Sequence, residues 1–259
     1  MAPSRFSLVK WYLDCVTTQG ETAILYCADL RWRSVHASYS SVLSTRGHAV
    51  ESHTSMAPYR LVSTADCIQV EFPRLRVTGQ WNAAAAPIQR TVYENASGSV
   101  VWNCVQPGSK AHLHIAGREF AGLGYAECLT LSLPPWQLPM RRLRWGRFVS
   151  SQDTLAWIDW QGPFSNSFAV HNGRPCELTS VSETQVKLSG AELRMEDSLP
   201  LRSGPAGSTI LPGAPALAKL LPHSLANIEE HKWRSRGTLQ AQEHRSDGWV
   251  IHEVVDWKL

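Results

Sequence analysis

The sequence lacks the short motifs that mark several common classes of enzyme. It contains no GxGxxG dinucleotide-binding fingerprint, no GxxxxGK[ST] phosphate-binding loop, no HExxH zinc-protease motif and no GxSxG nucleophile elbow. Its 6 cysteines occur without a CxxC pair or any other zinc-like spacing. We therefore expect chemistry that uses neither a cofactor nor a metal ion.

The sequence is also poor in charge and in long apolar runs. Charged residues make up 18% of the chain, and the formal net charge is +3. Only RRLRWGR (141–147) is locally basic, and it contains the core-like Leu143 and Trp145. Because a nucleic-acid-binding surface usually shows a clustered basic stripe, we expect no nucleic-acid partner. No segment reaches the roughly 20 apolar residues of a membrane-spanning helix, so we expect no stable membrane insertion.

The first residues, MAPSRFSLVKWYLDC, show neither the apolar run nor the cleavage site of a secretory signal. Cysteines with no disulfide-like or metal-like spacing are typical of a reducing compartment. We therefore expect a cytoplasmic protein with reduced, mostly buried thiols. The oligomeric state is left open.

Tryptophan, in contrast, is abundant. The chain contains 11 tryptophans, each of which buries a large area and carries a ring N–H that needs a partner. Such a composition favours large, aromatic-lined interiors. A pocket for an apolar or polyunsaturated ligand is one use of such an interior, and plain core packing in a β protein is another.

Short runs of alternating polar and apolar residues dominate the chain, and turn-forming stretches such as TTQGE, QPGSK and HNGRP separate them. These runs are WYLDCV (11–16), ETAILYCADLRW (21–32), RLVSTADCIQVEF (60–72), VVWNCV (100–105), HLHIAG (112–117), YAECLTLSL (125–133), RWGRFVS (144–150), TLAWIDW (154–160), TQVKLSG (184–190) and GWVIHEVVDW (248–257). Strands at this spacing predict an all-β sandwich or barrel. The best helical candidate is 215–231, which Pro222 would cut or bend.

A proline-rich stretch, PPWQLP (134–139), lies near the middle of the chain. Its prolines cannot donate to a β-ladder and bias their neighbours to extended conformations, as expected of a stiff connector. We predict two β units of similar size, 1–136 and 137–259.

The stretch GLGYAECLTLSLPPW (122–136) carries a carboxylate on an apolar face. As a strand it places Tyr125, Glu127, Leu129, Leu131 and Leu133 on one side, and the leucines predict that this side is buried. Desolvation by leucines and aromatic rings favours the neutral form of a carboxyl group, so Glu127 is expected to be protonated near neutral pH and to act as a proton donor. Tyr125 would orient the acid or relay its proton.

Other strands place charges between aromatic residues in the same way. Trp145 and Arg147 share one face of their strand, and Trp157 and Asp159 share one face of theirs. Inward charges are costly unless they are paired, so internal ion pairs such as Arg147 with Glu127 or Asp159 are the plain alternative to a catalytic role. A void of about 300 Å³ or more beside Glu127 would favour the enzyme.

An acid beside aromatic faces suits chemistry on a carbon–carbon double bond. The acid protonates the bond, cation–π attraction stabilises the developing carbocation, and water or an internal nucleophile captures it. His112 and His114 lie on the same side of a strand, a spacing that metal sites use, but a third ligand is missing nearby in the sequence. Solvent-facing polar residues are the favoured interpretation of that pair.

Several of these segments resemble a known superfamily. GLGYAE, the Pro-containing break after it, LRWGRF, WIDW and the two terminal segments KWYLDCVT and GWVIHEVVDW are similar to lipocalin-like (calycin) proteins that include carotenoid 1,2-hydratase, AttH-like proteins and tocopherol cyclase. The resemblance implies an all-β fold of two consecutive lipocalin-like antiparallel β-barrels. It also implies a lipophilic small molecule as substrate or ligand.

In the carotenoid hydratases of that superfamily the acid chemistry is attributed to a Tyr-x-Asp pair and an upstream His-x-Trp. Tyr125-Ala126-Glu127 resembles the first, with Glu in place of Asp, and Trp102 resembles the end of the second. Val100 stands where the His would be. Asn103, His112 or His114 would fill that polar role, or no hydration occurs.

Three hypotheses follow. The first is cofactor-independent acid-type catalysis on an isoprenoid or polyene-like apolar substrate, by hydration, cyclisation or isomerisation of a C=C bond. The second is a non-catalytic carrier of a lipophilic molecule, and the third is a barrel whose charges form only internal ion pairs. Under the first, the catalytic residues would be Glu127, Tyr125 and Asp159, and the substrate-binding residues Trp102, Asn103, Trp145, Arg147, Trp157 and His114.

Overall fold

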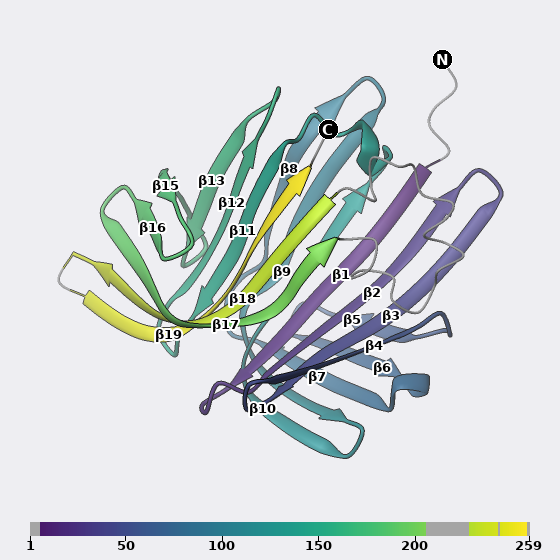
Figure 1. The fold of residues 1–259 in the computed structure, drawn as a ribbon, viewed down its shortest axis with the longest axis horizontal. Coiled ribbons are helices and arrows are strands. Elements are labelled where there is room, and N and C mark those ends of the chain that lie inside the picture. The colour runs from purple at the N-terminus through teal and green to yellow at the C-terminus, as the bar shows by residue number, and fades with distance from the viewer. Residues whose placement is uncertain (1–5, 206–227, 243, 258–259) are drawn as a thin grey trace. The chain divides into compact units, whose positions relative to one another are not determined.

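A computed structural model describes residues 6–205, 228–242 and 244–257 (Figure 1). Chain contacts divide it into two compact units, Met1–Leu138 and Pro139–Leu259. Each unit is built on one antiparallel β-sheet, so the predicted all-β class is confirmed. Within the described residues, helical structure is limited to two short 3-10 turns, η1 (Pro73–Leu75) and η2 (Pro135–Gln137). No helix in this part of the chain is long and apolar enough to cross a membrane.

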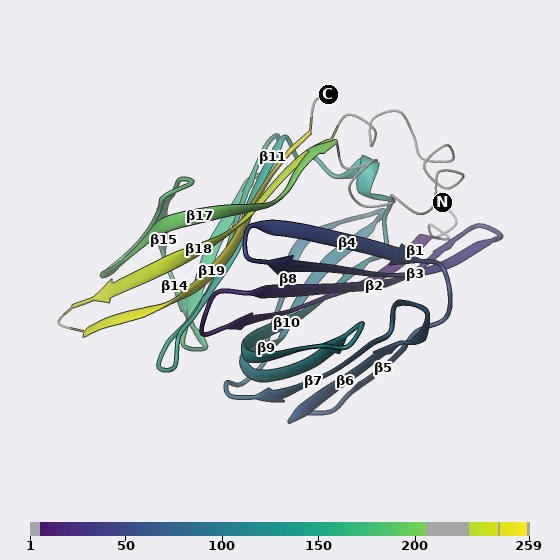
Figure 2. The same cartoon turned by 60° about the horizontal axis from the view of Figure 1, so that its bottom comes forward.

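The first unit contains ten strands. They are β1 (Phe6–Thr17), β2 (Thr22–Trp32), β3 (Val35–Arg46), β4 (Ala49–Ser55), β5 (Arg60–Ser63), β6 (Cys67–Phe72), β7 (Val77–Ala83), β8 (Ile88–Asn95), β9 (Gly98–Ile115) and β10 (Arg118–Leu131). Their order in the sheet is β4-β3-β2-β1-β10-β9-β7-β6-β5, with β8 pairing the first part of β9. The sheet is curled, so that η1, which follows β6, contacts β4 at the opposite edge. Figure 2 shows β5, β6 and β7 folded round below β2, β3 and β4.

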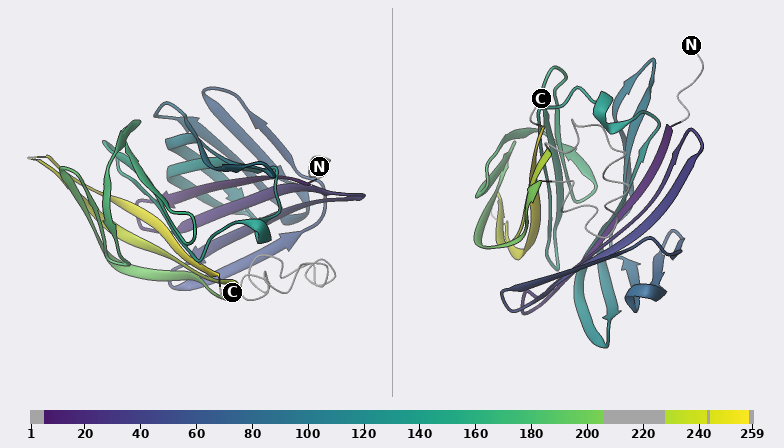
Figure 3. Two further views of the ribbon diagram at one scale, coloured as in Figure 1. Left: turned by 90° about the horizontal axis from the view of Figure 1, so that it is seen from above. Right: turned by 45° about the vertical axis from the view of Figure 1, so that its right-hand side comes forward.

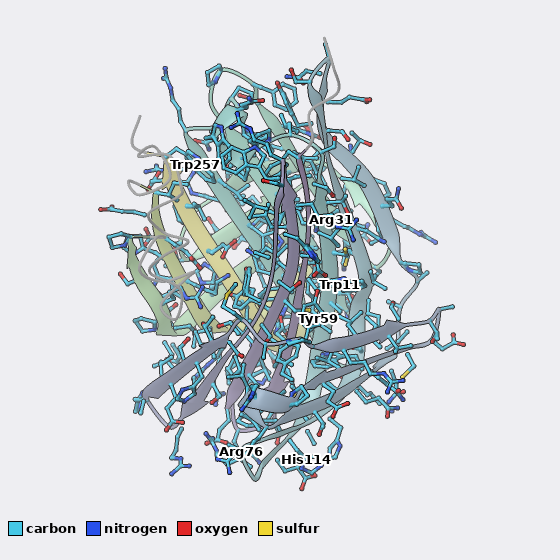
Figure 4. The ribbon with its side chains drawn as sticks, turned by 90° about the vertical axis from the view of Figure 1, so that its right-hand side faces the viewer. Trp11, Arg31, Tyr59, Arg76, His114 and Trp257 are labelled. Carbon is cyan, nitrogen blue, oxygen red and sulfur yellow. The ribbon has the colours of Figure 1, made fainter. Side chains whose placement is uncertain are left out.

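One apolar cluster fills the curl of this sheet. Its members come from β1, β2, β3, β6, β7, β9 and β10, among them Leu13 of β1, Leu25 of β2, Trp81 of β7 and Ala126 of β10, all fully buried. Trp11 and Tyr59 pack against its margin (Figure 4). Because successive side chains of a strand point to opposite faces, the cluster defines one face of β1, β2 and β10, and the residues between its members occupy the other.

Strand β9 differs from its sequence prediction. QPGSK (106–110) reads as a turn between two strands, yet it lies inside the 18-residue strand β9. Pro107 sits where β9 exchanges one neighbour for another: residues up to Cys104 pair with β8, and residues from Ser109 pair with β7. A missing N–H is tolerated there because the ladder with β10 is also irregular at this point.

The second unit contains nine strands. They are β11 (Arg142–Val149), β12 (Thr154–Gln161), β13 (Asn166–His171), β14 (Arg174–Cys176), β15 (Leu178–Val181), β16 (Gln185–Leu188), β17 (Ala191–Pro205), β18 (Ile228–Ala241) and β19 (His244–Trp257). Their order is β14-β13-β12-β11-β19-β18-β17-β16-β15, and contacts between β13 and β15 bring the two ends of the sheet close to closure (Figure 3). The long strands β17, β18 and β19 curve strongly in both views of Figure 3.

An apolar cluster lines one face of this sheet too. It includes Phe148, Trp157, Leu239 and Val250, all 1% exposed or less. Turn chemistry agrees with the sequence at HNGRP, where Asn172 (φ 49°) and Gly173 (φ 76°) form a tight turn with two left-handed residues between β13 and β14. The helix predicted over 215–231 is wrong over Ile228–His231, which begins β18, and the rest of it lies outside the described residues.

Candidate functional site

Glu127 is held by two hydrogen bonds that converge on one oxygen. The phenol O–H of Tyr125 and the indole Nε1–H of Trp102 both donate to Oε2 of Glu127, each at 2.6 Å. Tyr125 is fully buried and Trp102 is almost so, whereas Glu127 is partly exposed. The carboxylate of Glu127 is thus fixed by two rigid aromatic donors and remains partly accessible to solvent.

Strand register explains this meeting. Tyr125 and Glu127 are two residues apart on β10 and therefore share a face. Trp102 of β9 lies opposite Leu129, the next residue on that face of β10. An irregularity between Ala126 and Cys128 shifts the β9–β10 pairing, as β-bulges do, and the indole reaches the carboxylate diagonally.

Two glycines in GLGYAE allow β1 to approach β10 closely. A Cβ on Gly122 would lie 2.1 Å from the carbonyl oxygen of Val16, and a Cβ on Gly124 would lie 2.8 Å from that of Asp14. These contacts are with backbone atoms, which have little freedom to move away. The glycines therefore fix β1 against the strand that carries Tyr125 and Glu127.

Strand β1 adds a second carboxylate to this face. Asp14 is fully buried and lies directly across the ladder from Tyr125, while Tyr12 lies across from Glu127. The Tyr12 hydroxyl donates to Oδ2 of Asp14 at 2.9 Å. The rings of Tyr12 and Tyr125 meet edge to face with centroids 6.1 Å apart, and those of Tyr12 and Tyr26 with centroids 5.4 Å apart. Asp14 and Tyr12 were not predicted as site residues, although the alternation of WYLDCV already places both on one face.

Burial keeps the Tyr125 phenol and the Cys104 thiol neutral. It raises the pKa of the Tyr125 phenol well above its ordinary value, and the neighbouring Cys104 and Glu127 add to that rise. Burial also raises the pKa of the Cys104 thiol; the hydrogen bond with Tyr125 opposes this, and the charges of Glu127 and Asp14 reinforce it. Tyr125 therefore acts as a hydrogen-bond donor throughout the physiological pH range.

This cluster occupies the face of the sheet opposite the main apolar cluster of the first unit. Ala126, between Tyr125 and Glu127, belongs to that apolar cluster. Leu131 and Leu133 are buried, as the leucine pattern predicts. The aromatic and carboxylate face is thus a buried surface of its own, separate from the interior around Trp81.

The candidate residues of the second unit lie on two different faces. Arg147 is fully buried and donates through Nη1 to the carbonyl oxygen of Trp249 at 2.6 Å, and Trp145 shares its face. Trp157 belongs to the apolar cluster on the other face of the sheet. Its ring closes over Gly146, where an added Cβ would lie 2.1 Å from Cζ2. Trp157 is therefore part of the apolar core of this unit, and Arg147 lies on the opposite face of the sheet.

Asp159 is engaged by its own neighbours. Gln161 donates to Oδ2 at 2.7 Å, Ser167 donates to Oδ1 at 2.6 Å, and the guanidinium of Arg144 lies 3.6 Å from Oδ2. Alternation along β11 places Arg144 on the opposite face from Arg147. The contacts of Asp159 are therefore those of an internal polar cluster.

His114 and Asn103 lie apart from the Glu127 cluster. Asn103 is partly buried and, by alternation along β9, points to the opposite face from Trp102. His114 is exposed on β9, with its ring 4.8 Å from that of His112 (Figure 4). His112 in turn contacts Glu119 at 2.7 Å. Among the described residues, no group of three or more His, Cys, Asp or Glu side chains is arranged to hold a metal ion.

The two histidines border a surface pocket of about 380 Å³. Its lining comes from β5, β6, β7 and β9: Arg60, Val62, Gln69, Val70, Glu71, Thr78, Gly79, Gln80, His112 and His114. Glu127 is not among these residues.

No family model and no curated protein sequence matches the chain. Solved structures do. Kievitone hydratase from Nectria haematococca matches with a TM-score of 0.59 and 11% identity, over 99% of this chain and 92% of that one. An AttH protein from Nitrosomonas europaea matches with a TM-score of 0.58 and 10% identity, over 99% of this chain and 93% of that one. CghA, crystallised with the compound Sch 210972, matches with a TM-score of 0.58 and 11% identity, over 97% and 89%. At these identities the likeness concerns the fold, which is lipocalin-like, as predicted.

Proposed function

We propose that the chain is an enzyme that catalyses cofactor-independent proton transfer to a carbon–carbon double bond of an apolar substrate, with Glu127 as the residue that exchanges the proton. The observation that carries this proposal is the convergence of Tyr125 and Trp102 on one oxygen of Glu127, on a buried aromatic face. A carboxyl group fixed by two rigid donors is pre-positioned, as general acid–base catalysis requires.

Geometry divides the roles between the two oxygens of Glu127. Oε2 accepts both hydrogen bonds, so in the neutral acid the proton is carried by Oε1. After Glu127 has released its proton, the same two donors stabilise the carboxylate that remains. Tyr125 serves this purpose in its neutral form, in which burial holds it.

The surrounding rings supply the second requirement. Tyr12, Tyr26, Tyr125 and Trp102 present aromatic groups near the carboxyl group, and aromatic faces attract a developing carbocation. Such a site suits hydration, cyclisation or isomerisation of an isoprenoid or polyene-like chain. The fold shared with a hydratase is consistent with this class of reaction.

The test begins with mass spectrometry of small molecules that copurify with the full chain, followed by incubation of the compound found, or of a panel of acyclic isoprenoid alcohols, with protein in D2O. The wild-type protein is expected to place deuterium on carbon in the product. Glu127→Gln is expected to lower kcat by roughly 100-fold or more, the range of a general acid. Tyr125→Phe and Trp102→Phe should each lower it less, because the carboxyl group remains.

Glu119→Gln provides the matched control, since Glu119 is an exposed carboxylate on the same strand and its side chain pairs with His112. It should leave turnover unchanged. Full activity of Glu127→Gln in a protein with unchanged melting temperature would exclude the acid role. Equal ligand affinity in both proteins with no turnover in either would instead identify a carrier.

A further inference from the structure

Arg234 is a partly buried cation. It lies on β18 between Lys232 and Arg236, on the same face of the strand. Lys232 has an ion pair with Glu253, and Arg236 has one with Asp197 at 3.7 Å. Within the described residues, no carboxylate lies at ion-pair distance from Arg234, and its buried Nε has no hydrogen-bond partner.

The side chain of Arg234 packs on an indole ring and not against a carboxylate of the described residues. The guanidinium of Arg234 lies 4.8 Å from the centroid of Trp249, and that of Arg236 lies 5.5 Å from the same ring. Trp249 itself is only 9% exposed. Nε of Arg234 is buried, whereas the residue as a whole is partly exposed.

A third guanidinium adds to the positive charge here. Ile251 of β19 lies between Arg147 on one neighbouring strand and Arg234 on the other. Arg147 is fully buried, and its Nη1 donates to the backbone oxygen of Trp249. Three arginines therefore contact Trp249, two at its ring and one at its backbone oxygen.

The environment disfavours the charge of Arg234. Burial lowers the pKa of its guanidinium, the nearby Arg236 lowers it further, and Asp197 opposes this only weakly. Asp197 is too exposed to neutralise a partly buried cation, with 74% of its side chain accessible. A desolvated charge without a partner lowers the stability of a fold unless a ligand supplies the partner.

We propose that Arg234 and Arg236, stacked on Trp249, form a binding site for an oxyanion, the carboxylate or phosphate group of a small-molecule ligand. The guanidinium fork matches the geometry of both groups, and the indole ring fixes its plane before the ligand arrives. The site is built entirely from β18 and β19 and does not use Glu127 or its partners. The proposed anion site therefore does not depend on the proposed proton-transfer chemistry.

Isothermal titration of the full chain tests the site with three probes: inorganic phosphate, benzoate, and benzamide as the uncharged counterpart of benzoate. Phosphate or benzoate is expected to bind and benzamide is not, and the stronger of the two anions identifies the group that the site prefers. Arg234→Gln should weaken anion binding at least tenfold. Arg245→Gln, at an exposed arginine of β19 that pairs with Asp247, should leave it unchanged.

Thermal unfolding provides the second readout, because an anion bound to the folded state raises the melting temperature. Phosphate or benzoate should raise it for the wild-type protein and for Arg245→Gln, but not for Arg234→Gln. Without anion, Arg234→Gln should melt no lower than wild type, since it loses no ionic partner. Equal binding by the wild-type protein and Arg234→Gln, binding of benzamide as tight as that of benzoate, or no binding of either anion would overturn the proposal.

Discussion

Acidification is expected to destabilise the second unit through one buried histidine. His252 of β19 is 4% exposed, its ring stacks on Trp233 with centroids 5.2 Å apart, and its Nε2 lies 3.1 Å from the hydroxyl of Ser235. Burial, reinforced by the charge of Lys232, lowers its pKa from 6.5 to about 4. His252 is therefore neutral in the folded protein and becomes protonated first in the unfolded chain.

The sign and size of the effect follow from linkage. The stabilisation is fully present above pH 6.5, where neither state binds the proton, and is lost as the pH falls toward 4. A difference of this size between the folded and unfolded pKa corresponds to a loss of about 2.5 kcal/mol between pH 7.5 and pH 4.5. Because the ring is almost inaccessible to water, solvent screening reduces this value little.

Urea unfolding of the wild-type protein and of His252→Gln between pH 7.5 and pH 4.5 measures the effect. Glutamine keeps an acceptor for the Ser235 hydroxyl and removes the titrating group, so any packing defect it introduces is the same at every pH. The difference in unfolding free energy between the two proteins should shrink by about 2.5 kcal/mol on acidification. Parallel pH profiles would refute the assignment of the neutral form to His252.

Two further predictions concern packing and thiol chemistry. Gly146→Ala places a Cβ 2.1 Å from the ring of the buried Trp157, so we expect a loss of about 1–3 kcal/mol in the urea unfolding free energy, and an unchanged value would show that the ring has room to move. Burial raises the pKa of the Cys27 thiol, whereas Cys67 is partly exposed, so mass spectrometry after brief treatment with a thiol reagent at pH 8 should find Cys67 labelled and Cys27 not. Labelling of both at equal rates in the folded protein would contradict the buried position of Cys27.

Alternation along the chain predicted which residues share a face of a strand. It predicted little about whether that face belongs to the apolar core of the unit or to the opposite side of the sheet. Tyr125 and Glu127 lie on one buried face, as the pattern of β10 requires, and Trp102 is close enough to bind the carboxylate. The contact with Trp102 depends on a register shift between β9 and β10, and a single sequence does not reveal which strands pair or where they slip.

The second unit shows the same limit. Strand β12 is apolar on both faces, so its pattern does not decide whether Trp157 faces the core or the opposite surface. Trp157 lies in the core, and the predicted pairing of Arg147 with Asp159 gives way to a contact of Asp159 with Arg144. The environment of Arg234 is likewise not predictable from the sequence, because β17 and β19 both carry carboxylates, and only the structure shows that none of the described ones lies at ion-pair distance from it.

Strand β9 has a modular construction that bears on how this protein can be altered. Its second part, paired with β7, contributes Leu113 to the apolar cluster, whereas its first part, paired with β8, carries Trp102. Across β8, Arg90 is the residue opposite Trp102. Substitutions or length changes in the hairpin formed by β8 and the first part of β9 are therefore expected to alter the surroundings of Glu127 and to leave the β7–β9 ladder intact. Strand β9 thus joins a segment that borders Glu127 to a segment that belongs to the apolar core of the unit.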